Sequence, residues 1–453
     1  MIAGLYIPQG AIRQSGAGVK TTGQHGASNI PLAYDPRVLR LLSFLTRTQA
    51  WLTPPEIAKT FRIDGRPIGV ATLYRWFAAL EDATGLAYFP YPRMNVLGLQ
   101  EVTVRIFGLR SPEVLSTVPF SHAFLVELGF DGEAHVSQDY WIPGPALKTF
   151  EEYWRSAVDL DLVKKVDILP ARNTHFLFSR FESVVRPNGW VEMGEGGDTR
   201  YFADLLRRHL QEPFDTRLAE WITETPLLVP LILEHLWGHY SSRHVWQHIQ
   251  AKGESPLERF RKGLPAKTLR KKGATLRLMQ RQWKMLLRRF DSAFLQPVVF
   301  LPPQQFPNCI LLSLHAQTGS TDRIVELGHG VARHSLVTAV MPELGWGGRC
   351  KVWSMTPLAN LPSLLRLSQE HRANAEGPSL ALSDLEASRR LVEPAFCRFD
   401  WSSFDPTALA WTFDGEGHLE RLKDMRSKTA VTAGFIPARS KALLQRLGNV
   451  HDA

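Results

Sequence analysis

Apolar and polar residues follow two periodicities along the chain, one typical of helices and the other of strands. In the first part, apolar residues recur at helical spacing over 36–48, 54–61 and 69–82, and an extended apolar run follows at 86–92. Thr53 is a suitable cap for the second of these helices, because proline follows it at the first helical position. Three short helices that end in an extended segment are typical of a winged helix-turn-helix.

The next part changes to the alternation of strands. Strands are predicted at 102–106, 122–130, 134–142 and 166–169, with helices at 111–118 and 145–158 between them. Asp131 and Gly132 separate the second strand from the third, and Asp-Gly is a strong hairpin signal. The order β-α-β-β-α-β predicts a ferredoxin-like domain.

The second half of the chain repeats this order. Helices are predicted at 226–237, 243–251 and 273–290, and an extended run at 294–300 takes the place of a second wing. Strands at 309–316, 335–341, 349–355 and 395–399 then enclose helices at 321–331 and 358–370. We therefore expect an α+β fold of two tandem units, each a winged helix followed by a ferredoxin-like domain. Coincidental similarity between unrelated α/β segments is the alternative.

These patterns divide the chain into seven segments. They are a flexible N-terminal arm (1–29), a winged helix (30–92), a ferredoxin-like α/β domain (93–190), a linker (191–221), a second, basic winged helix (222–302), a second ferredoxin-like α/β domain (303–415) and a C-terminal tail (416–453). Segments 251–272 and 372–391 have no counterpart in the first half and are predicted insertions.

This order of elements, with hairpins at Gly132 and at Gly347–Gly348, resembles the Lrp/AsnC family of feast/famine regulators. The resemblance covers 30–190 and 220–415. It implies a DNA-binding regulator whose sheet domains pair and bind a small-molecule effector, often an amino acid. Family members are usually single units that dimerise, so two units in one chain imply an internal pseudo-dimer or a homodimer. No residue matches an effector motif.

Positive charge is concentrated in one segment. Residues 256–290 hold twelve Lys or Arg and one acid, a net charge of +11, whereas the whole chain carries +9. Arg277, Arg281, Lys284 and Arg288 are spaced by four, three and four residues and share one helix face. Apolar residues at the same spacing occupy the opposite face. Such a stripe attracts a polyanion. A solvated surface helix is the plainer interpretation, but surface helices usually mix both signs of charge.

We expect this segment to bind double-stranded DNA. The positions predicted to contact it are Lys267, Arg270, Lys271, Lys272, Thr275, Arg277, Arg281, Lys284 and Arg288, with Arg66, Thr72, Tyr74 and Arg75 as weaker contacts from the first unit. Residues 267–272 would hold phosphates and position the long helix, whose Arg277, Arg281 and Lys284 would reach the major groove, where arginine reads guanine.

Other chemistry is weakly indicated. Three distant cysteines, at Cys309, Cys350 and Cys397, predict neither a disulfide framework nor a cysteine zinc site. Two His-x-x-x-His pairs, His235/His239 and His244/His248, could each place two rings on one helix face, but they lack the sequence of a zinc hydrolase. Further histidines recur near predicted strand edges: His122, His135, His315, His329 and His334. We expect no metal, cofactor, catalytic residue or membrane span.

The sequence therefore predicts a sequence-specific DNA-binding protein, a transcriptional regulator rather than an enzyme, in the cytoplasm at the nucleoid. Two alternatives stay open. A plasmid-type replication initiator also uses tandem winged helices. An Lrp-like siroheme decarboxylase would use His and Arg around the sheet and needs no basic recognition helix.

Overall fold

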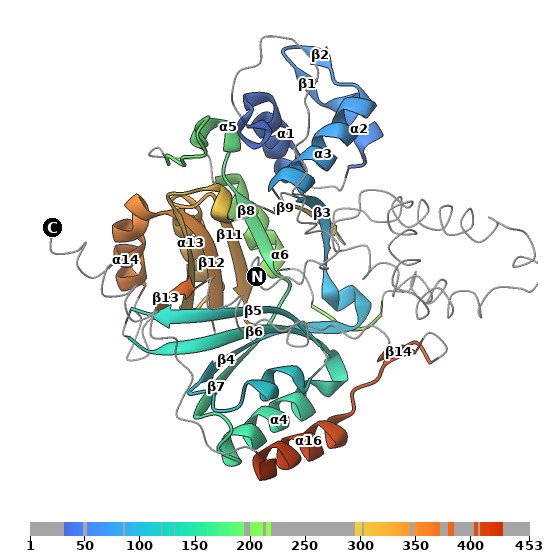
Figure 1. Cartoon of the computed structure of the whole chain (residues 1–453), viewed down its shortest axis with the longest axis vertical. Coiled ribbons are helices and arrows are strands. Elements are labelled where there is room, and N and C mark those ends of the chain that lie inside the picture. The colour runs from blue at the N-terminus through green and yellow to red at the C-terminus, as the bar shows by residue number, and fades with distance from the viewer. Residues whose placement is uncertain are drawn as a thin grey trace, which may run out of the picture.

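A computed structural model describes residues 31–48, 52–84, 87–118, 120–130, 132–193, 200–211, 214–218, 295–300, 303–344, 348–371, 379–384, 403–405 and 408–428. The fold is α+β, with a group of helices at one end and a large antiparallel sheet flanked by further helices (Figure 1). No helix among the described residues is long and apolar enough to span a bilayer. The predicted DNA contacts from Lys267 to Arg288, both histidine pairs and the helices of the second predicted winged helix lie outside the described ranges.

The N-terminal helical group follows the predicted elements. It consists of η1 (Leu32–Tyr34), α1 (Pro36–Arg47), α2 (Pro54–Thr60), the short strands β1 (Arg62–Ile63) and β2 (Arg66–Pro67), and α3 (Val70–Thr84). Asp35 caps α1 by accepting a hydrogen bond from the Arg37 amide. Thr53 and Glu56 form a capping box at α2. The apolar stripe of α1 is fully buried, so this helix is held by packing as well as by its cap.

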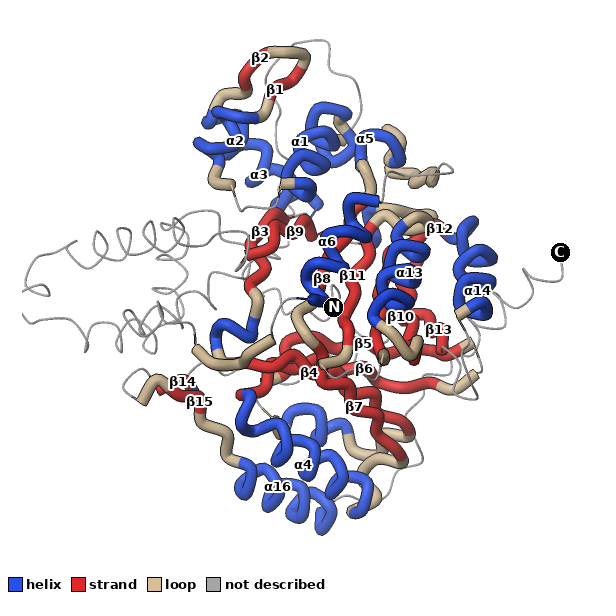
Figure 2. Tube along the Cα trace, turned by 180° about the vertical axis from the view of Figure 1, so that it is seen from behind, coloured by secondary structure: helices blue, strands red, loops and turns tan. Residues whose placement is uncertain are grey.

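Residues 99–171 form the first half of the sheet. Its elements are β4 (Leu99–Phe107), η3 (Pro112–Ser116), β5 (Ser121–Gly129), β6 (Ala134–Pro143), α4 (Leu147–Asp159) and β7 (Lys165–Ala171). The strand order β7-β4-β6-β5 is that of a ferredoxin-like fold. The helix expected at 111–118 is only a short 3-10 helix. On the outer face, α4 packs with α16 (Gly415–Lys428), which lies in the segment predicted to be a tail (Figure 2).

The second half of the sheet repeats this topology. It consists of β10 (Cys309–Gln317), α13 (Thr321–Ala332), β11 (Val337–Pro342), β12 (Arg349–Pro357), α14 (Leu361–Glu370) and β13 (Ser379–Asp384), in the order β13-β10-β12-β11. The fourth strand was expected at 395–399, which lies outside the described residues. Its place is taken by β13, inside the predicted insertion at 372–391. Leu380 and Leu382 of β13 are buried in the hydrophobic core that β10, α13 and α14 also form. This burial favours β13 as the fourth strand.

Two cross-connections join the halves into one nine-stranded sheet. β13 pairs with β10 of its own half and with β5 of the other. β7 pairs with β4, and the chain then continues as β8 (His175–Phe178), which pairs with β11. Backbone hydrogen bonds from Arg172 N–H to the Pro342 carbonyl and from Leu344 N–H to the Pro170 carbonyl link the first half directly to the second. Because β7 and β8 are consecutive segments, the sheet curls into a barrel-like body whose inner face is enclosed by both halves.

The two predicted wings pair with each other rather than forming separate hairpins. β3 (Ala87–Pro92) and β9 (Leu295–Phe300) make a two-stranded antiparallel ribbon with Pro90 opposite Pro297. The ribbon buries Tyr88 and Val299, so pairing across the halves removes apolar surface that two isolated wings would expose. The remaining short elements are η2 (Met94–Leu97), η4 (Gly144–Ala146), α5 (Phe181–Val184), α6 (Arg200–Gln211), η5 (Pro303–Gln305), η6 (Leu358–Asn360), β14 (Phe404–Asp405) and β15 (Ala410–Trp411).

Candidate functional site

The inner face of the barrel carries polar side chains that alternate with apolar residues along each strand. On β6, Val136 and Tyr140 belong to the core beneath α4, whereas His135, Ser137 and Asp139 point to the other side of the sheet. Corresponding inward positions on other strands hold Thr103, Arg105, Glu127, Ser313, His315 and Lys351. Polar groups from both halves thus meet inside one enclosed body.

A cavity of about 430 Å³ opens at one end of this interior. Its lining includes three cations from different strands, Arg105 on β4, Lys165 on β7 and Arg349 on β12, together with His135 and His315. Lys165 has no ion pair among the described residues, and its ammonium lies 5.5 Å from the centre of the Phe107 ring. Two acids, Glu133 and Asp167, also line the cavity, so its charge is mixed, and the three cations are the groups that could bind carboxylates of a ligand.

Asp167 ties two of the cations together. Its carboxylate accepts a hydrogen bond from Arg105 Nε at 3.0 Å and another from Arg349 Nη1 at 3.3 Å. Burial raises the pKa of Asp167, but the two guanidinium groups outweigh this effect and hold the pKa below its usual value. Arg349 also donates to Glu343 at 2.8 Å. These contacts fix both guanidinium groups at the cavity before any ligand is bound.

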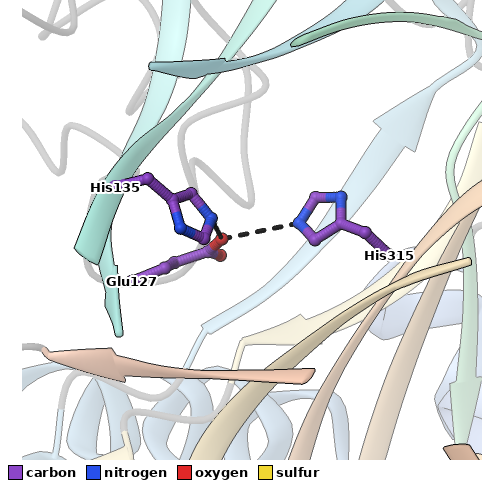
Figure 3. A group of neighbouring side chains, drawn as sticks. All are labelled: Glu127, His135 and His315. Atoms are coloured by element: carbon purple, nitrogen blue, oxygen red, sulfur yellow. Dashed lines mark hydrogen bonds and ion pairs between the residues drawn. The ribbon is translucent and has the colours of Figure 1, made fainter. Parts of the chain in front are cut away.

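Glu127, His135 and His315 form a buried cluster at the back of the cavity (Figure 3). Oε2 of Glu127 lies 3.0 Å from Nε2 of His135 and 3.5 Å from Nε2 of His315. Ser313 donates its hydroxyl to Oε1. Burial raises the pKa of Glu127, but the hydrogen bond with His135 and the nearby His315 and Lys351 outweigh this effect and hold the pKa well below its usual value, so this carboxyl is ionised. Burial lowers the pKa of His315 to about 4, which leaves this ring neutral near pH 7.

Deeper inside, Lys351 and Asp139 form an ion pair between the halves. Nζ of Lys351 lies 3.1 Å from Oδ1 of Asp139 and donates to Ser137 Oγ at 2.9 Å, while Thr103 donates to the same carboxylate at 2.6 Å. Both charged side chains are almost fully buried. The charge of each therefore depends on the other.

A β-bulge turns His122 toward this interior. The pairing of β5 with β6 shifts by one residue between Ser121 and Ala123, and the extra residue is His122. Its ring stacks on Trp141 with centroids 3.9 Å apart. Neither ring nitrogen has a hydrogen-bond partner among the described residues. Burial lowers the pKa of His122 to about 3, so the ring is neutral.

Four of the predicted DNA contacts lie in the described part of the chain, all in the N-terminal helical group. Arg66 lies on β2, whereas Thr72, Tyr74 and Arg75 lie in the first turns of α3. Arg75 donates to the Thr72 hydroxyl at 3.3 Å, and Tyr74 is exposed. The lining of the cavity includes none of the four residues.

Sequence reasoning named only part of the cavity cluster. His122, His135 and His315 were noted as recurring histidines, and no site was predicted from them. Glu127, Asp139 and Lys351 were missed, although each lies inside a segment predicted to be a strand. A charge within an apolar strand indicates a buried partner, because an unpaired charge in the interior is costly. That signal could have identified these three positions.

Comparisons with known proteins give no match to a family model and none to a curated protein. Among solved structures, the chain is similar to the siroheme decarboxylase NirDL at 12% identity, covering 87% of this chain and 99% of that one, with a TM-score of 0.38. The same enzyme in co-complex with an iron-uroporphyrin III analogue gives 12% identity, coverage of 77% and 90%, and a TM-score of 0.36. An anthrone oxidase-like protein gives 8%, coverage of 63% and 91%, and a TM-score of 0.26.

These neighbours correct one expectation from the sequence. The chain was expected not to be an enzyme, whereas the first two solved structures to which it is similar are of an enzyme. The strand order within each half agrees with the Lrp/AsnC-like order of elements that the sequence resembles.

Proposed function

We propose that the protein is an enzyme that removes a carboxyl group from a substrate with several carboxylates, bound in the cavity between the two halves. The observation that carries this proposal is the convergence of Arg105, Lys165 and Arg349 on a space also lined by His135 and His315. A volume of about 430 Å³ is within the usual range of small-molecule sites.

The cations and the histidines have different tasks. Arg105 and Arg349, held by Asp167, and Lys165, which has no ion-pair partner in the described part of the chain, bind carboxylates of the substrate and fix its orientation. When carbon dioxide leaves, the electrons of the broken C–C bond stay on carbon, which must then take a proton. His135 is placed to supply this proton, because its ring lines the cavity and Glu127 behind it fixes the orientation of the ring through the contact at 3.0 Å.

Siroheme is the substrate to test first. It is a tetrapyrrole with several carboxylate side chains, and siroheme decarboxylation was one of the alternatives open from the sequence. The structure of NirDL with an iron-uroporphyrin III analogue names a ligand of the same class. The charged side chains of the cavity would contact the carboxylate groups of such a molecule rather than its macrocycle.

The test is incubation of the purified full chain with siroheme, followed by absorbance and by mass spectrometry of the tetrapyrrole. We expect a bound, coloured species and loss of carbon dioxide from the substrate. His135→Gln should lower kcat by about 100-fold or more, whereas Arg105→Gln should mainly raise KM. Arg323→Gln, on the exposed face of α13, is the control and should leave both constants unchanged. Siroheme that neither binds nor loses carbon dioxide would reject this substrate.

Double-stranded DNA binding remains a second candidate, because one observation favours it. Residues 256–290 carry a net charge of +11 in a chain of +9. Steeply salt-dependent binding that is abolished by Arg277→Glu, Arg281→Glu and Lys284→Glu together would support contact through this segment. Binding that is absent, or unchanged by the triple substitution, would remove the candidate. A regulator with both properties would couple the cavity ligand, as its effector, to DNA.

A further inference from the structure

Three potential metal ligands converge at the back of the cavity. One oxygen of Glu127 and one ring nitrogen each of His135 and His315 lie within 4.8 Å of one another. The three residues come from β5, β6 and β10, so both halves of the barrel contribute (Figure 3). All three side chains are buried, and no other group of this kind occurs among the described residues.

The distances fit donors that share an ion. Two neighbouring ligands bound about 2.0–2.1 Å from a first-row divalent ion lie roughly 2.8–3.0 Å apart in an octahedral arrangement and roughly 3.3–3.4 Å apart in a tetrahedral one. Oε2 of Glu127 is 3.0 Å from Nε2 of His135 and 3.5 Å from Nε2 of His315. The third pair, the two imidazole nitrogens, lies within 4.8 Å, so the rings would move toward each other as they bind one ion.

We propose that Glu127, His135 and His315 bind a divalent transition-metal ion, with the remaining coordination positions directed to the cavity. Two imidazoles and one carboxylate favour zinc, cobalt or ferrous iron over magnesium or calcium, which prefer oxygen ligands. Ser313 holds the other carboxylate oxygen, and such an outer contact orients the ligand for the metal.

The charges around the cluster permit a cation there. Lys351 and Arg105 are the nearest cations and would oppose the ion if they were unpaired. Lys351 is paired with Asp139 at 3.1 Å, and Arg105 contacts Asp167 at 3.0 Å, a carboxylate that it shares with Arg349, so both positive charges are balanced by carboxylates other than Glu127. The charge of Glu127 is therefore available to the ion.

The proposed metal site adjoins the cavity of the proposed decarboxylation, because His135 and His315 also line that cavity. Direct metal binding does not depend on which reaction the cavity supports.

The experiment uses the full chain treated with a chelator and titrated with Co²⁺, whose visible absorption reports coordination by nitrogen and oxygen, and with Zn²⁺ by calorimetry. We expect Co²⁺ bands that Zn²⁺ displaces. Glu127→Gln and His315→Gln should each weaken binding at least about 10-fold, and Ser313→Ala by about 10-fold or more. His334→Gln, a half-buried histidine outside the cluster, is the control and should bind as wild type.

Two outcomes would overturn the proposal. One is the absence of saturable Co²⁺ binding by wild type that remains folded by circular dichroism. The other is binding that Glu127→Gln and His315→Gln leave unchanged, which would assign the ion to other histidines, such as the pairs between His235 and His248. Siroheme decarboxylation by a protein that binds no Co²⁺ would reject the metal site alone. Metal binding without decarboxylation would reject the proposed function alone.

Discussion

At the scale of single residues, the ion pair of Lys351 with Asp139 is a test of how the halves are held together. The charges lie inside the barrel on strands of different halves. Lys351→Met removes one charge and leaves Asp139 buried without its partner, so we expect the free energy of unfolding to fall by about 3–5 kcal/mol. Urea denaturation measures this loss. The double variant Lys351→Met/Asp139→Asn should recover most of it, and equal losses in the single and double variants would show that the pair is not coupled.

Glu101 makes the stability depend on pH. This fully buried carboxyl accepts hydrogen bonds from Tyr91 and Thr174, but burial outweighs them and raises its pKa from 4.5 to about 7. The folded state therefore keeps the proton over a range in which the unfolded state loses it. The contribution of Glu101 to the free energy of unfolding is therefore complete below about pH 4.5 and is lost as the pH rises to about 7. Each pH unit within this window costs at most about 1.4 kcal/mol, a total of roughly 3 kcal/mol.

Unfolding free energies measured across this window, for wild type and for Glu101→Gln, test the assignment. The variant should lose this part of the slope, whereas Glu326→Gln, at an exposed position on α13, should keep it. A slope that is the same in wild type and in Glu101→Gln would contradict the raised pKa.

The candidate site was only partly predictable from these residues. Histidine is rare enough that His122, His135 and His315 were noticeable in the sequence. Their convergence depends on pairing between residues almost 200 positions apart, as Glu127 and Ser313 show, and no local pattern encodes that pairing. His122 faces the interior because of a bulge, which alternation along the strand does not predict.

At the scale of elements, the strands with clear alternation and their connecting hairpins were predicted well, and the partners of isolated strands were not. The Asp131-Gly132 signal correctly joined β5 to β6. β13 was missed, because its sequence Ser-Leu-Ala-Leu-Ser-Asp lies in a segment that had no counterpart in the first half. The extended runs at 86–92 and 294–300 were recognised as strands, but their pairing with each other is a long-range contact.

The ribbon of β3 and β9 can be tested by a disulfide. Ala87 and Phe300 are Cα partners in the antiparallel register, and facing residues lie within the range that a disulfide spans. Ala87→Cys/Phe300→Cys should therefore form a crosslink under mild oxidation, seen by mass spectrometry of unreduced peptides. Ala87→Cys/Val298→Cys, shifted by two positions, is the control and should crosslink poorly. Equal crosslinking of both pairs would mean that the register slips.

At the scale of the whole molecule, the exchange of strands between the halves makes them one folding unit. β13, the last strand of the second half, pairs with β5 of the first half, and β8, which follows the first half, pairs with β11 of the second. The polar cluster draws side chains from both halves. Neither half can lose its core without exposing backbone groups and charges of the other. The duplication that this symmetry suggests remains a prediction, but the mechanical coupling follows from the pairing alone.

This coupling predicts a single cooperative unfolding of the described core. Phe150→Ala creates a cavity in the first half, beneath α4, and should cost about 3–5 kcal/mol. Leu364→Ala on α14 does the same in the second half, at about 2–5 kcal/mol. Native-state hydrogen exchange then compares the slowest amides of β4 with those of β10. If the halves unfold together, either substitution lowers protection in both strands by the same free energy, because those amides exchange only by global unfolding. Loss confined to the substituted half would show that the halves open independently, and the site between them would then be formed by docking of two domains rather than by folding of one.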